Sequence, residues 1–539
     1  MPSRVVSATK HLGSTYINDV QFREENVVLL RTVTVENGQV QGLPAADPRI
    51  TSFKGIPFAA PPVGRNRWRA PQPASDWDGV LQAFDFAPTS MQAPTVIDDN
   101  NIYTREWAVD PDLPMNEDCL YLNVWTPAKR TDEKLPVFVW YFGGGLQVGH
   151  TAEMEFDGER IARRGIVVVT INYRLNAFGF LCHPEISAES PHAPANFGHL
   201  DQQAGTAWVK RNIAAFGGDP DQITIGGQSA GGGSVLSQMT SPQNKGLFQR
   251  AVIMSGIATE LYPNVPVPAV RSTLRDAEQK GVEFFRFLGV ASLEEARQLD
   301  AFTLRDKVLE FRSFWGTVID DQFCIGDPFT RFMQHKRELV PVMLGHTSSE
   351  FWTKPAVNSV EELKQMATEL FGEDAPAFLE RCEADTGDLD HALQRASVRM
   401  IEHAIQLVIR SNSGHPSETP LYYYNFDAEI PGWDQPSTFH SVDLWFFFET
   451  LAKCWRPFTG KHYDLARQMC NYLSNFIATG DPNGLDSTGK PLPYWIPSST
   501  EQPYRMEFGD LAQLQRAVPE PVLELVIEYF FKKQNEPVI

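Results

Sequence analysis

Two apolar runs of strand length, residues 134–142 (KLPVFVWYF) and 165–173 (GIVVVTINY), constrain the fold of this chain most strongly. Each run is continuously apolar and rich in β-branched and aromatic residues, as in strands that are buried on both faces of a parallel sheet. Residues 154–164 between them have helical spacing, and a helical stripe over 202–216 precedes a third strand at 222–226. This alternation predicts an α/β fold with a mostly parallel central sheet and helices on both faces.

The pattern changes over residues 262–414, where amphipathic helices predominate. Residues 293–304 and 388–410 have helical spacing. A strand-like segment at 339–345 interrupts these helices. Another strand follows them at 421–426, and a last helix is expected at 522–532. We therefore expect a single catalytic domain over residues 1–539, with a helical insertion or cap at 262–414 over the carboxyl edge of the sheet.

Charge and cysteine content exclude several classes of protein. The chain has 47 Lys and Arg against 67 Asp and Glu, a net charge of −20, and we expect no nucleic-acid partner because such a surface repels phosphate backbones. No apolar stretch approaches the roughly 18 residues that a membrane span needs. Residues 1–16 lack the pattern of a signal peptide. The six cysteines form no CxxC pair, which predicts no metal site and favours a cytoplasmic location. The sequence does not indicate an oligomeric state.

A G-x-S-x-G pentapeptide, Gly227-Gln228-Ser229-Ala230-Gly231, follows the strand expected at 222–226 and precedes a helical segment of small residues. In this strand–turn–helix context a nucleophilic serine is presented on a sharp turn. The glycines are needed because the turn leaves no room for side chains at the flanking positions. The pattern predicts that Ser229 is a catalytic nucleophile; the alternative is a glycine-rich packing turn.

A glycine triplet, Gly143-Gly144-Gly145, ends the strand expected at 134–142. A tetrahedral oxyanion needs preorganised N–H donors, and glycine lets backbone amides approach closely. We expect the amides of Gly144, Gly145 and Ala230 to form an oxyanion hole. A glycine triplet alone is more often a flexible turn, but the serine turn downstream favours the catalytic interpretation.

A nucleophilic serine on such a turn is followed in the chain by an acid and then by a histidine. His440 lies in a loop after the strand at 421–426, from which it can reach Ser229, so we prefer it as the base. The other histidines that follow the candidate acid are His391, His403, His415 and His462. Glu350, after the strand at 339–345, is a candidate acid. Asp320 and Asp321 compete with it nearly evenly on sequence grounds.

Several segments resemble the type-B carboxylesterase/cholinesterase family, in particular its bacterial para-nitrobenzyl-esterase-like members, and the resemblance covers most of the chain. Besides the serine turn and the glycine triplet, these segments are residues 54–59 (KGIPFA), 116–124 (NEDCLYLNV), 172–174 (NYR), 216–220 (FGGDP) and 480–483 (GDPN). The resemblance implies the α/β-hydrolase fold. It also implies that Glu350, and neither aspartate, is the acid, and it supports His440 as the base.

The resemblance also draws attention to four positions near the predicted site. Gln228 precedes the nucleophile, where the family has Glu or Gln. Ser255 resembles a supporting serine of the family, although a buried hydroxyl at a strand end is an equal alternative. Phe351 stands where a glycine usually follows the acid. Ser90 replaces the cysteine that partners Cys119 in secreted relatives, so the usual disulfide cannot form.

Apolar side chains flank the catalytic segments and are candidates for the substrate pocket. They are Phe142, Leu146, Phe314, Trp315, Trp352, Trp433 and Trp445. Each of them taken singly is also compatible with ordinary core packing.

These residues together predict a serine hydrolase that cleaves uncharged aryl or alkyl carboxylic esters of small molecules through an acyl-enzyme. The reaction needs neither a metal nor an organic cofactor. One alternative is a catalytically idle relative that acts as a binding or scaffold protein. Another is an amide, carbamate or lactone hydrolase, because these reactions pass through the same type of oxyanion.

Overall fold

The computed structural model describes residues 29–534, except residues 97, 99, 108–112, 264 and 266–270. The amino-terminal segment that lacks a signal-peptide pattern lies outside the described residues.

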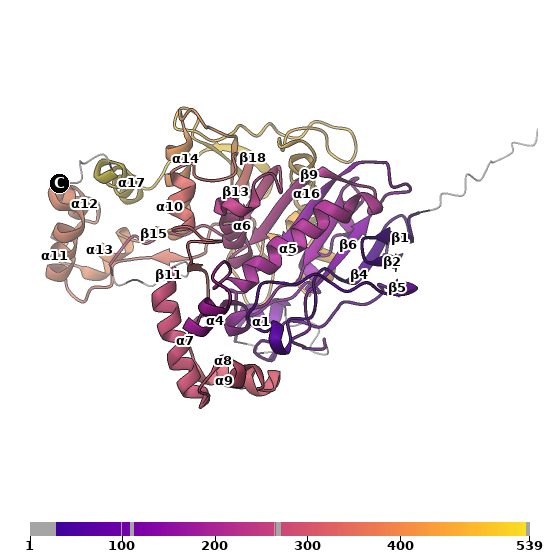
Figure 1. Cartoon of the computed structure of the whole chain (residues 1–539). Coiled ribbons are helices and arrows are strands. Elements are labelled where there is room, and N and C mark those ends of the chain that lie inside the picture. The colour runs from indigo at the N-terminus through magenta and orange to yellow at the C-terminus, as the bar shows by residue number, and fades with distance from the viewer. Residues whose placement is uncertain are drawn as a thin grey trace, which may run out of the picture.

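A mixed sheet of eleven strands forms the centre of the described chain (Figure 1). In spatial order the strands are β18 (Ala512–Arg516), β17 (Tyr504–Phe508), β16 (Leu421–Phe426), β13 (Val342–Thr347), β10 (Arg250–Met254), β9 (Gly218–Gln228), β7 (Leu135–Tyr141), β8 (Val167–Ile171), β6 (Tyr121–Thr126), β4 (Thr51–Pro57) and β3 (Leu43–Pro44). The strands from β17 to β8 are parallel, and those outside them are antiparallel. The expected mostly parallel sheet is confirmed.

Both faces of this sheet are covered because its central strands are apolar on both sides. In β7 successive side chains alternate between two cores, with Val139 in one and Trp140 in the other. Helices α5 (Phe197–Asn212) and α6 (Ala230–Thr240) contribute to the first core, and α16 (Gly460–Thr479) contributes to the second. The sheet is therefore the middle layer of three, as parallel sheets require.

The segment from residue 262 to residue 414 is mostly helical but also supplies β13 to the central sheet. In Figure 1, α7 to α9 extend below the sheet, whereas α11 to α13 lie to its left beside α17. The helices of this segment are α7 (Leu274–Leu288), α8 (Leu293–Arg297), α9 (Ala301–Phe311), α10 (Pro328–Met333), α11 (Val360–Phe371), α12 (Ala375–Arg381), α13 (Leu389–Arg395) and α14 (Met400–Asn412).

The prediction of a single helix over 388–410 is wrong, because a short strand, β15 (Val398–Arg399), separates α13 from α14. It pairs antiparallel with β14 (Trp352–Thr353), which follows the end of β13. The segments on both sides of β15 have helical spacing, so the sequence shows no break there. The strand that pairs with β15 lies about 45 residues earlier, where no local pattern can indicate it.

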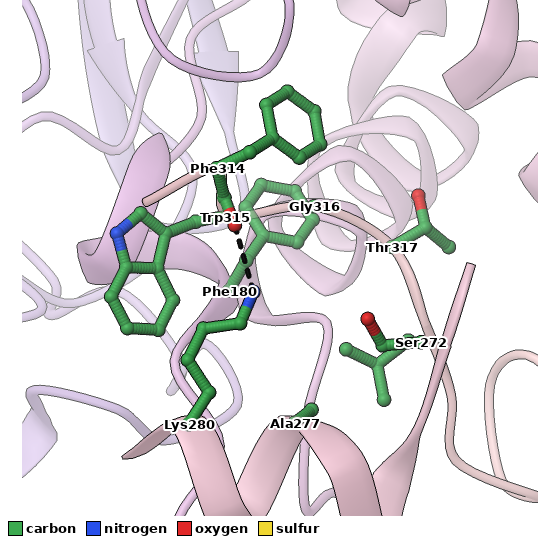
Figure 2. Close-up of a pocket in the computed structure, with 9 residues that line it drawn as sticks. Phe180, Ser272, Ala277, Lys280, Phe314, Trp315, Gly316 and Thr317 are labelled. Carbon is green, nitrogen blue, oxygen red and sulfur yellow. Dashed lines mark hydrogen bonds between the residues drawn. The ribbon is translucent and has the colours of Figure 1, made fainter. Parts of the chain in front are cut away.

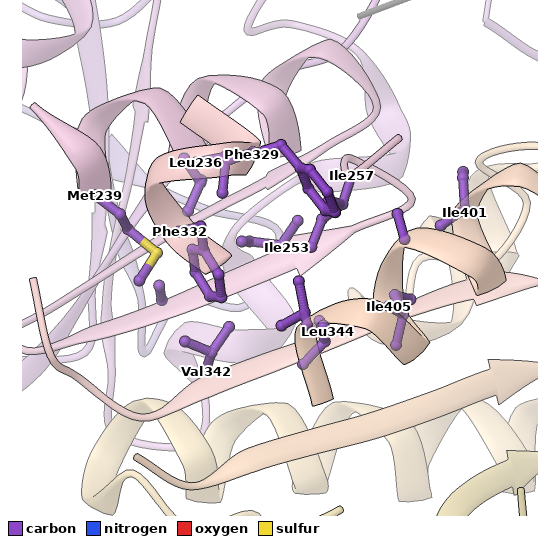
Figure 3. Close-up of a cluster of buried hydrophobic side chains, with 14 of the residues drawn as sticks. Leu236, Met239, Ile253, Ile257, Phe329, Phe332, Val342, Leu344, Ile401 and Ile405 are labelled. Atoms are coloured by element: carbon purple, nitrogen blue, oxygen red, sulfur yellow. The ribbon is translucent and has the colours of Figure 1, made fainter. Parts of the chain in front are cut away.

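Helix α14 is anchored on the sheet by a buried apolar cluster (Figure 3). Ile405 packs in the same cluster as Leu344 of β13 and Ile253 of β10, together with Leu236 of α6 and Phe332 of α10. This packing fixes the position of the first turn of α14, which reaches the candidate site.

The other strands and α-helices are short or lie at the edges of the molecule. They are β1 (Thr32–Val35), β2 (Gly38–Gln41), β5 (Val80–Gln82), β11 (Ser272–Thr273), β12 (Val318–Ile319), α1 (Ile102–Trp107), α2 (Glu159–Ala162), α3 (Asn176–Phe180), α4 (Pro184–Glu189), α15 (Leu444–Phe447) and α17 (Pro521–Gln534). None of the helices described is long and apolar enough to cross a membrane.

Candidate active site

Ser229 lies on a strained turn between β9 and α6. Its backbone has φ 55° and ψ −125°, in the region that disfavours residues with a Cβ. Its amide donates to the Met254 carbonyl at 2.8 Å, which ties the turn to the neighbouring strand β10. A Cβ on Gly231 would lie 2.1 Å from the Tyr141 carbonyl oxygen, so only glycine lets α6 begin this close to the sheet. The turn holds the partly exposed Ser229 above the carboxyl end of β9.

Glu350 and His440 form a buried acid–base pair. Nδ1 of His440 donates to Oε2 of Glu350, whose side chain is 1% exposed. The other carboxylate oxygen accepts from Oγ of Ser255 at 2.6 Å and from the amide of Thr347 at 2.8 Å. Burial raises the pKa of Glu350, but the charge of His440 and the hydrogen bonds from His440 and Ser255 outweigh it and lower that pKa below its usual value. The glutamate therefore stays ionised and holds the imidazole with Nδ1 protonated.

The free ring nitrogen of His440 faces Gln228. Nε2 lies 3.2 Å from the side-chain nitrogen of Gln228. Because Nδ1 carries the proton, the Gln228 amide donates to the Nε2 lone pair. Within the described part of the chain, Ser229 and His440 do not form a hydrogen bond with each other. A base in a free enzyme often contacts its nucleophile fully only once substrate is bound.

The glycine triplet forms a loop next to the serine turn. Gly144 and Gly145 have φ of 100° and 65°, and the Gly144 carbonyl accepts from the amides of Gln147 and Val148. Neither the Gly144 nor the Gly145 amide donates a backbone hydrogen bond within the described residues. The amide of Ala230 is at the first position of α6, where helical amides have no partner within the helix. All three amides are available for an oxyanion.

The four rival histidines have other surroundings than Glu350. His391 pairs with an exposed glutamate, His415 stacks on a second histidine ring, His462 caps α16, and His403 is buried within α14. Of the histidines that the sequence left as alternatives, only His440 contacts Glu350.

The two competing aspartates have other roles. Asp320 is buried and accepts hydrogen bonds from the Asn196 side chain and from the Cys324 amide, both at 2.8 Å. Asp321 is exposed on the adjacent turn. The structure thus brings Glu350, and neither aspartate, to His440.

A cavity of about 110 Å³ opens beside Ser229. Two of the expected pocket residues, Leu146 and Phe314, line it. Other lining side chains come from elements that are far apart in sequence, namely Ile257, Arg271, Thr317, Phe351, Met400 and Ile401. Sequence reasoning missed most of these because no local pattern links them.

The structure places the other expected pocket residues elsewhere. Phe142 is buried and stacks on Tyr173 with ring centroids 4.3 Å apart, and Trp445 is buried within α15. Trp352 and Trp433 are 52% and 75% exposed. Trp315 lines a smaller neighbouring pocket, which shares Phe314 and Thr317 with the cavity beside Ser229 (Figure 2).

Phe351 occupies the position after Glu350, where the resemblance leads us to expect glycine. Its φ is 45°, which is why glycine suits this position. Its ring packs edge-on against the His440 ring, with centroids 4.5 Å apart, and also lines the cavity. The side chain therefore forms a wall that glycine could not provide.

Asp443 is a second buried carboxyl near the acid–base pair. Its Oδ2 accepts from the Tyr424 hydroxyl at 2.8 Å. Burial, together with the charge of Glu350, raises the pKa of Asp443 to about 7. No group of three or more potential metal ligands is present among the described residues.

Comparison with known proteins agrees with this geometry. The sequence pattern of the carboxylesterase family matches residues 30–521, so the chain belongs to that family. It has the α/β-hydrolase fold and is a type-B carboxylesterase, a carboxylic ester hydrolase.

The similar proteins are esterases. A fumonisin B1 esterase of Sphingopyxis macrogoltabida is 33% identical over 464 residues, covering 83% of this chain and 79% of the relative. The para-nitrobenzyl esterase of Bacillus subtilis is 29% identical and covers 84% of this chain and 90% of the relative. A solved PNB esterase superposes with a TM-score of 0.75 at 26% identity, covering 92% of this chain and 99% of that chain.

Proposed function

We propose that the chain hydrolyses carboxylic esters with a Ser229-His440-Glu350 triad through an acyl-enzyme. The observation that carries this proposal is the Glu350–His440 pair beside the strained serine turn. Ser229 Oγ attacks the ester carbonyl while its proton passes to Nε2 of His440. The imidazolium then gives that proton to the leaving alkoxide, and water repeats the cycle to release the acid.

The same proposal assigns supporting roles to nearby groups. The amides of Gly144, Gly145 and Ala230 donate to the oxyanion, and each such donor contributes roughly 3 kcal/mol to lowering the barrier. Ser255 and the Thr347 amide hold Glu350 in place. The carboxylate in turn stabilises the imidazolium that forms during the reaction.

Small-molecule esters with uncharged aryl or alkyl groups around the reacting carbonyl are the proposed substrates. The apolar side chains of Leu146, Ile257, Phe351, Met400 and Ile401 support this choice, because they line the cavity beside Ser229. No metal or organic cofactor takes part in the proposed reaction.

We also propose that residues 1–539 act as one catalytic domain, with 262–414 as its cap. The contribution of Phe314, Phe351 and Met400 to the cavity supports a cap that helps to bind substrate. The six free cysteines support a cytoplasmic location, and the net charge of −20 argues against nucleic acid as a partner.

The proposal is tested by hydrolysis of 4-nitrophenyl esters from acetate to decanoate, with wild-type protein and with Ser229→Ala. We expect turnover by the wild type and a loss of roughly a thousandfold or more in kcat in the folded variant. The chain length with the highest kcat/KM then measures the acyl pocket. A folded wild type that hydrolyses no ester would overturn the proposal and favour a binding role, whereas hydrolysis only of amides, carbamates or lactones would reassign the bond that is cleaved.

A further inference from the structure

The cavity beside Ser229 contains one charged side chain among the described residues that line it. Arg271 precedes β11 and lines the same cavity as Ser229 and Gly145 of the glycine loop. The other lining groups are apolar side chains, glycines and hydroxyls. The chain has a net charge of −20, so most of its surface repels anions. A cation in this mostly apolar pocket would instead attract an anionic group of a substrate.

The lining residues indicate which half of an ester enters this cavity. The cavity is lined by Ser229 and by two of the residues whose amides are candidate oxyanion donors, Gly145 and Ala230, but the lining does not include His440. The leaving alcohol must lie next to His440, because it receives its proton from that side chain. The lining therefore favours the acyl half as the occupant of the cavity that Arg271 lines.

We propose that Arg271 binds a carboxylate at the far end of the acyl chain, so that half-esters of dicarboxylic acids are better substrates than uncharged esters of the same length. This inference rests on the proposed ester hydrolysis and extends its substrate class from uncharged esters to esters whose acyl chain ends in a carboxylate. The apolar walls contact the chain next to the carbonyl, and the guanidinium forms charge-assisted hydrogen bonds with the terminal carboxylate.

The surroundings of Arg271 are compatible with this role. Burial lowers the pKa of Arg271, whereas Asp327 and Cys324 raise it, and an arginine remains charged in proteins. The Asp327 carboxylate caps α10 by accepting from the Thr330 amide at 2.7 Å. With five N–H donors, a guanidinium can bind a substrate carboxylate in addition to its contacts within the protein.

Phe314 and Thr317 line both this cavity and the neighbouring pocket, and each is contacted by a side chain that does not line the cavity. Lys280 of α7 donates to the Phe314 carbonyl at 2.9 Å (Figure 2). His199 contacts Thr317 Oγ1 at 2.8 Å. Burial, and to a lesser extent the charge of Arg271, lower the pKa of His199 to about 4. A neutral histidine adds no second cation next to the proposed carboxylate site.

The test compares 4-nitrophenyl half-esters of glutaric, adipic and pimelic acid with 4-nitrophenyl pentanoate, hexanoate and heptanoate. The readout is the ratio of kcat/KM for the charged ester to that for the uncharged ester of equal length. Rates with Ser229→Ala are subtracted, because half-esters also react spontaneously. We expect a ratio above one for wild-type protein at one or more chain lengths.

Variants of Arg271 distinguish a direct contact between its guanidinium and the substrate carboxylate from the general electrostatic field of the protein. We expect Arg271→Met to lower the ratio roughly tenfold or more and Arg271→Lys to retain part of it. Arg275→Met removes a cation from an exposed position of α7 and should leave the ratio within about twofold.

The outcomes distinguish this inference from the proposed function. A wild-type ratio at or below one at every chain length overturns the Arg271 inference, whether or not the variants fold. An equal fall in the ratio in Arg275→Met would also overturn it, because the field of the protein would then suffice. Failure of the proposed function would instead appear as no hydrolysis of the uncharged esters above the Ser229→Ala rate.

Discussion

The side-chain nitrogen of Gln228 lies 3.2 Å from Nε2 of His440, the nitrogen that accepts the Ser229 proton in the proposed mechanism. The Gln228 side chain also lies close to the glycine loop, since a Cβ on Gly143 would lie 2.8 Å from the Gln228 side-chain oxygen. Gln228 therefore helps to orient the His440 ring, and in the proposed mechanism it yields the Nε2 lone pair to Ser229 when a substrate is attacked.

Replacing Gln228 with glutamate should change the pH dependence of hydrolysis. A carboxylate beside Nε2 favours the imidazolium, which cannot accept a proton, so the acid limb of the kcat/KM profile should move to higher pH by about one unit. Gln228→Met removes the same donor without adding a charge and should leave that limb in place. Equal profiles for Gln228→Glu and wild type would show that Gln228 does not face the working base.

Replacing Glu350 with glutamine should abolish most activity while preserving the fold. The variant cannot stabilise the imidazolium and favours the wrong tautomer of His440, so we expect kcat to fall by roughly a thousandfold or more. Asp321→Asn is the matched control at an exposed rival position and should retain activity within a few-fold. A comparable loss in the Asp321 variant, measured at equal folding by circular dichroism, would argue against Glu350 as the acid.

Replacing Gly144 with alanine should disturb the oxyanion donors. The new Cβ would lie 2.1 Å from the Val148 carbonyl oxygen at a φ of 100°, so the loop must move. Loss of one aligned donor predicts a fall in kcat of about a hundredfold or more. Gly165→Ala carries a similar strain, at φ 82° with no atom within 4 Å of the new Cβ, and should keep kcat near that of the wild type. Equal kcat values for both variants would contradict the role of this loop.

Replacing Asp443 with asparagine should change how stability depends on pH. The folded-state pKa of Asp443 is raised to about 7, so between about pH 4 and 7 the folded chain holds a proton that the unfolded chain has released. This group therefore makes the folded state less stable as pH rises through that range. We expect the Tm of Asp443→Asn, relative to wild type, to be higher at pH 7.5 than at pH 5.

An asparagine at position 443 can still accept from the Tyr424 hydroxyl, so the variant tests the titration of Asp443 and not the loss of its hydrogen bond. A constant difference in Tm between the two proteins across this pH range, measured by scanning fluorimetry, would contradict the raised pKa of Asp443.

The parts of the fold that sequence predicted are those that local patterns determine. The strand at 421–426 has the same limits as β16, and the serine turn lies between a strand and a helix as its glycines require. The pairing of β14 with β15 could not be predicted, because it joins Trp352 to Arg399 across a long insertion. Helical spacing alone carries no information about such a partner.

In the candidate site, too, local patterns indicated some residues and gave no information about others. The motif and the resemblance led to Ser229, Glu350 and His440, which are tied to recognisable turns and strand ends. Closeness in sequence to these segments did not identify the residues that line the cavity, since a side chain such as Trp445 is buried in the core. No sequence motif marks Arg271 as a pocket residue, because the cavity it lines is formed by segments that are far apart in sequence.

The most direct test of the triad uses diethyl 4-nitrophenyl phosphate, followed by intact mass measurement and peptide mapping. Attack by Ser229 forms an O–P bond and expels one 4-nitrophenolate, which leaves a stable diethylphosphoryl serine. We expect one such group per chain, on the peptide that contains Ser229, and its loss in His440→Ala under the same conditions. Modification at another residue, or none in a folded chain that hydrolyses esters, would contradict Ser229 as the activated nucleophile.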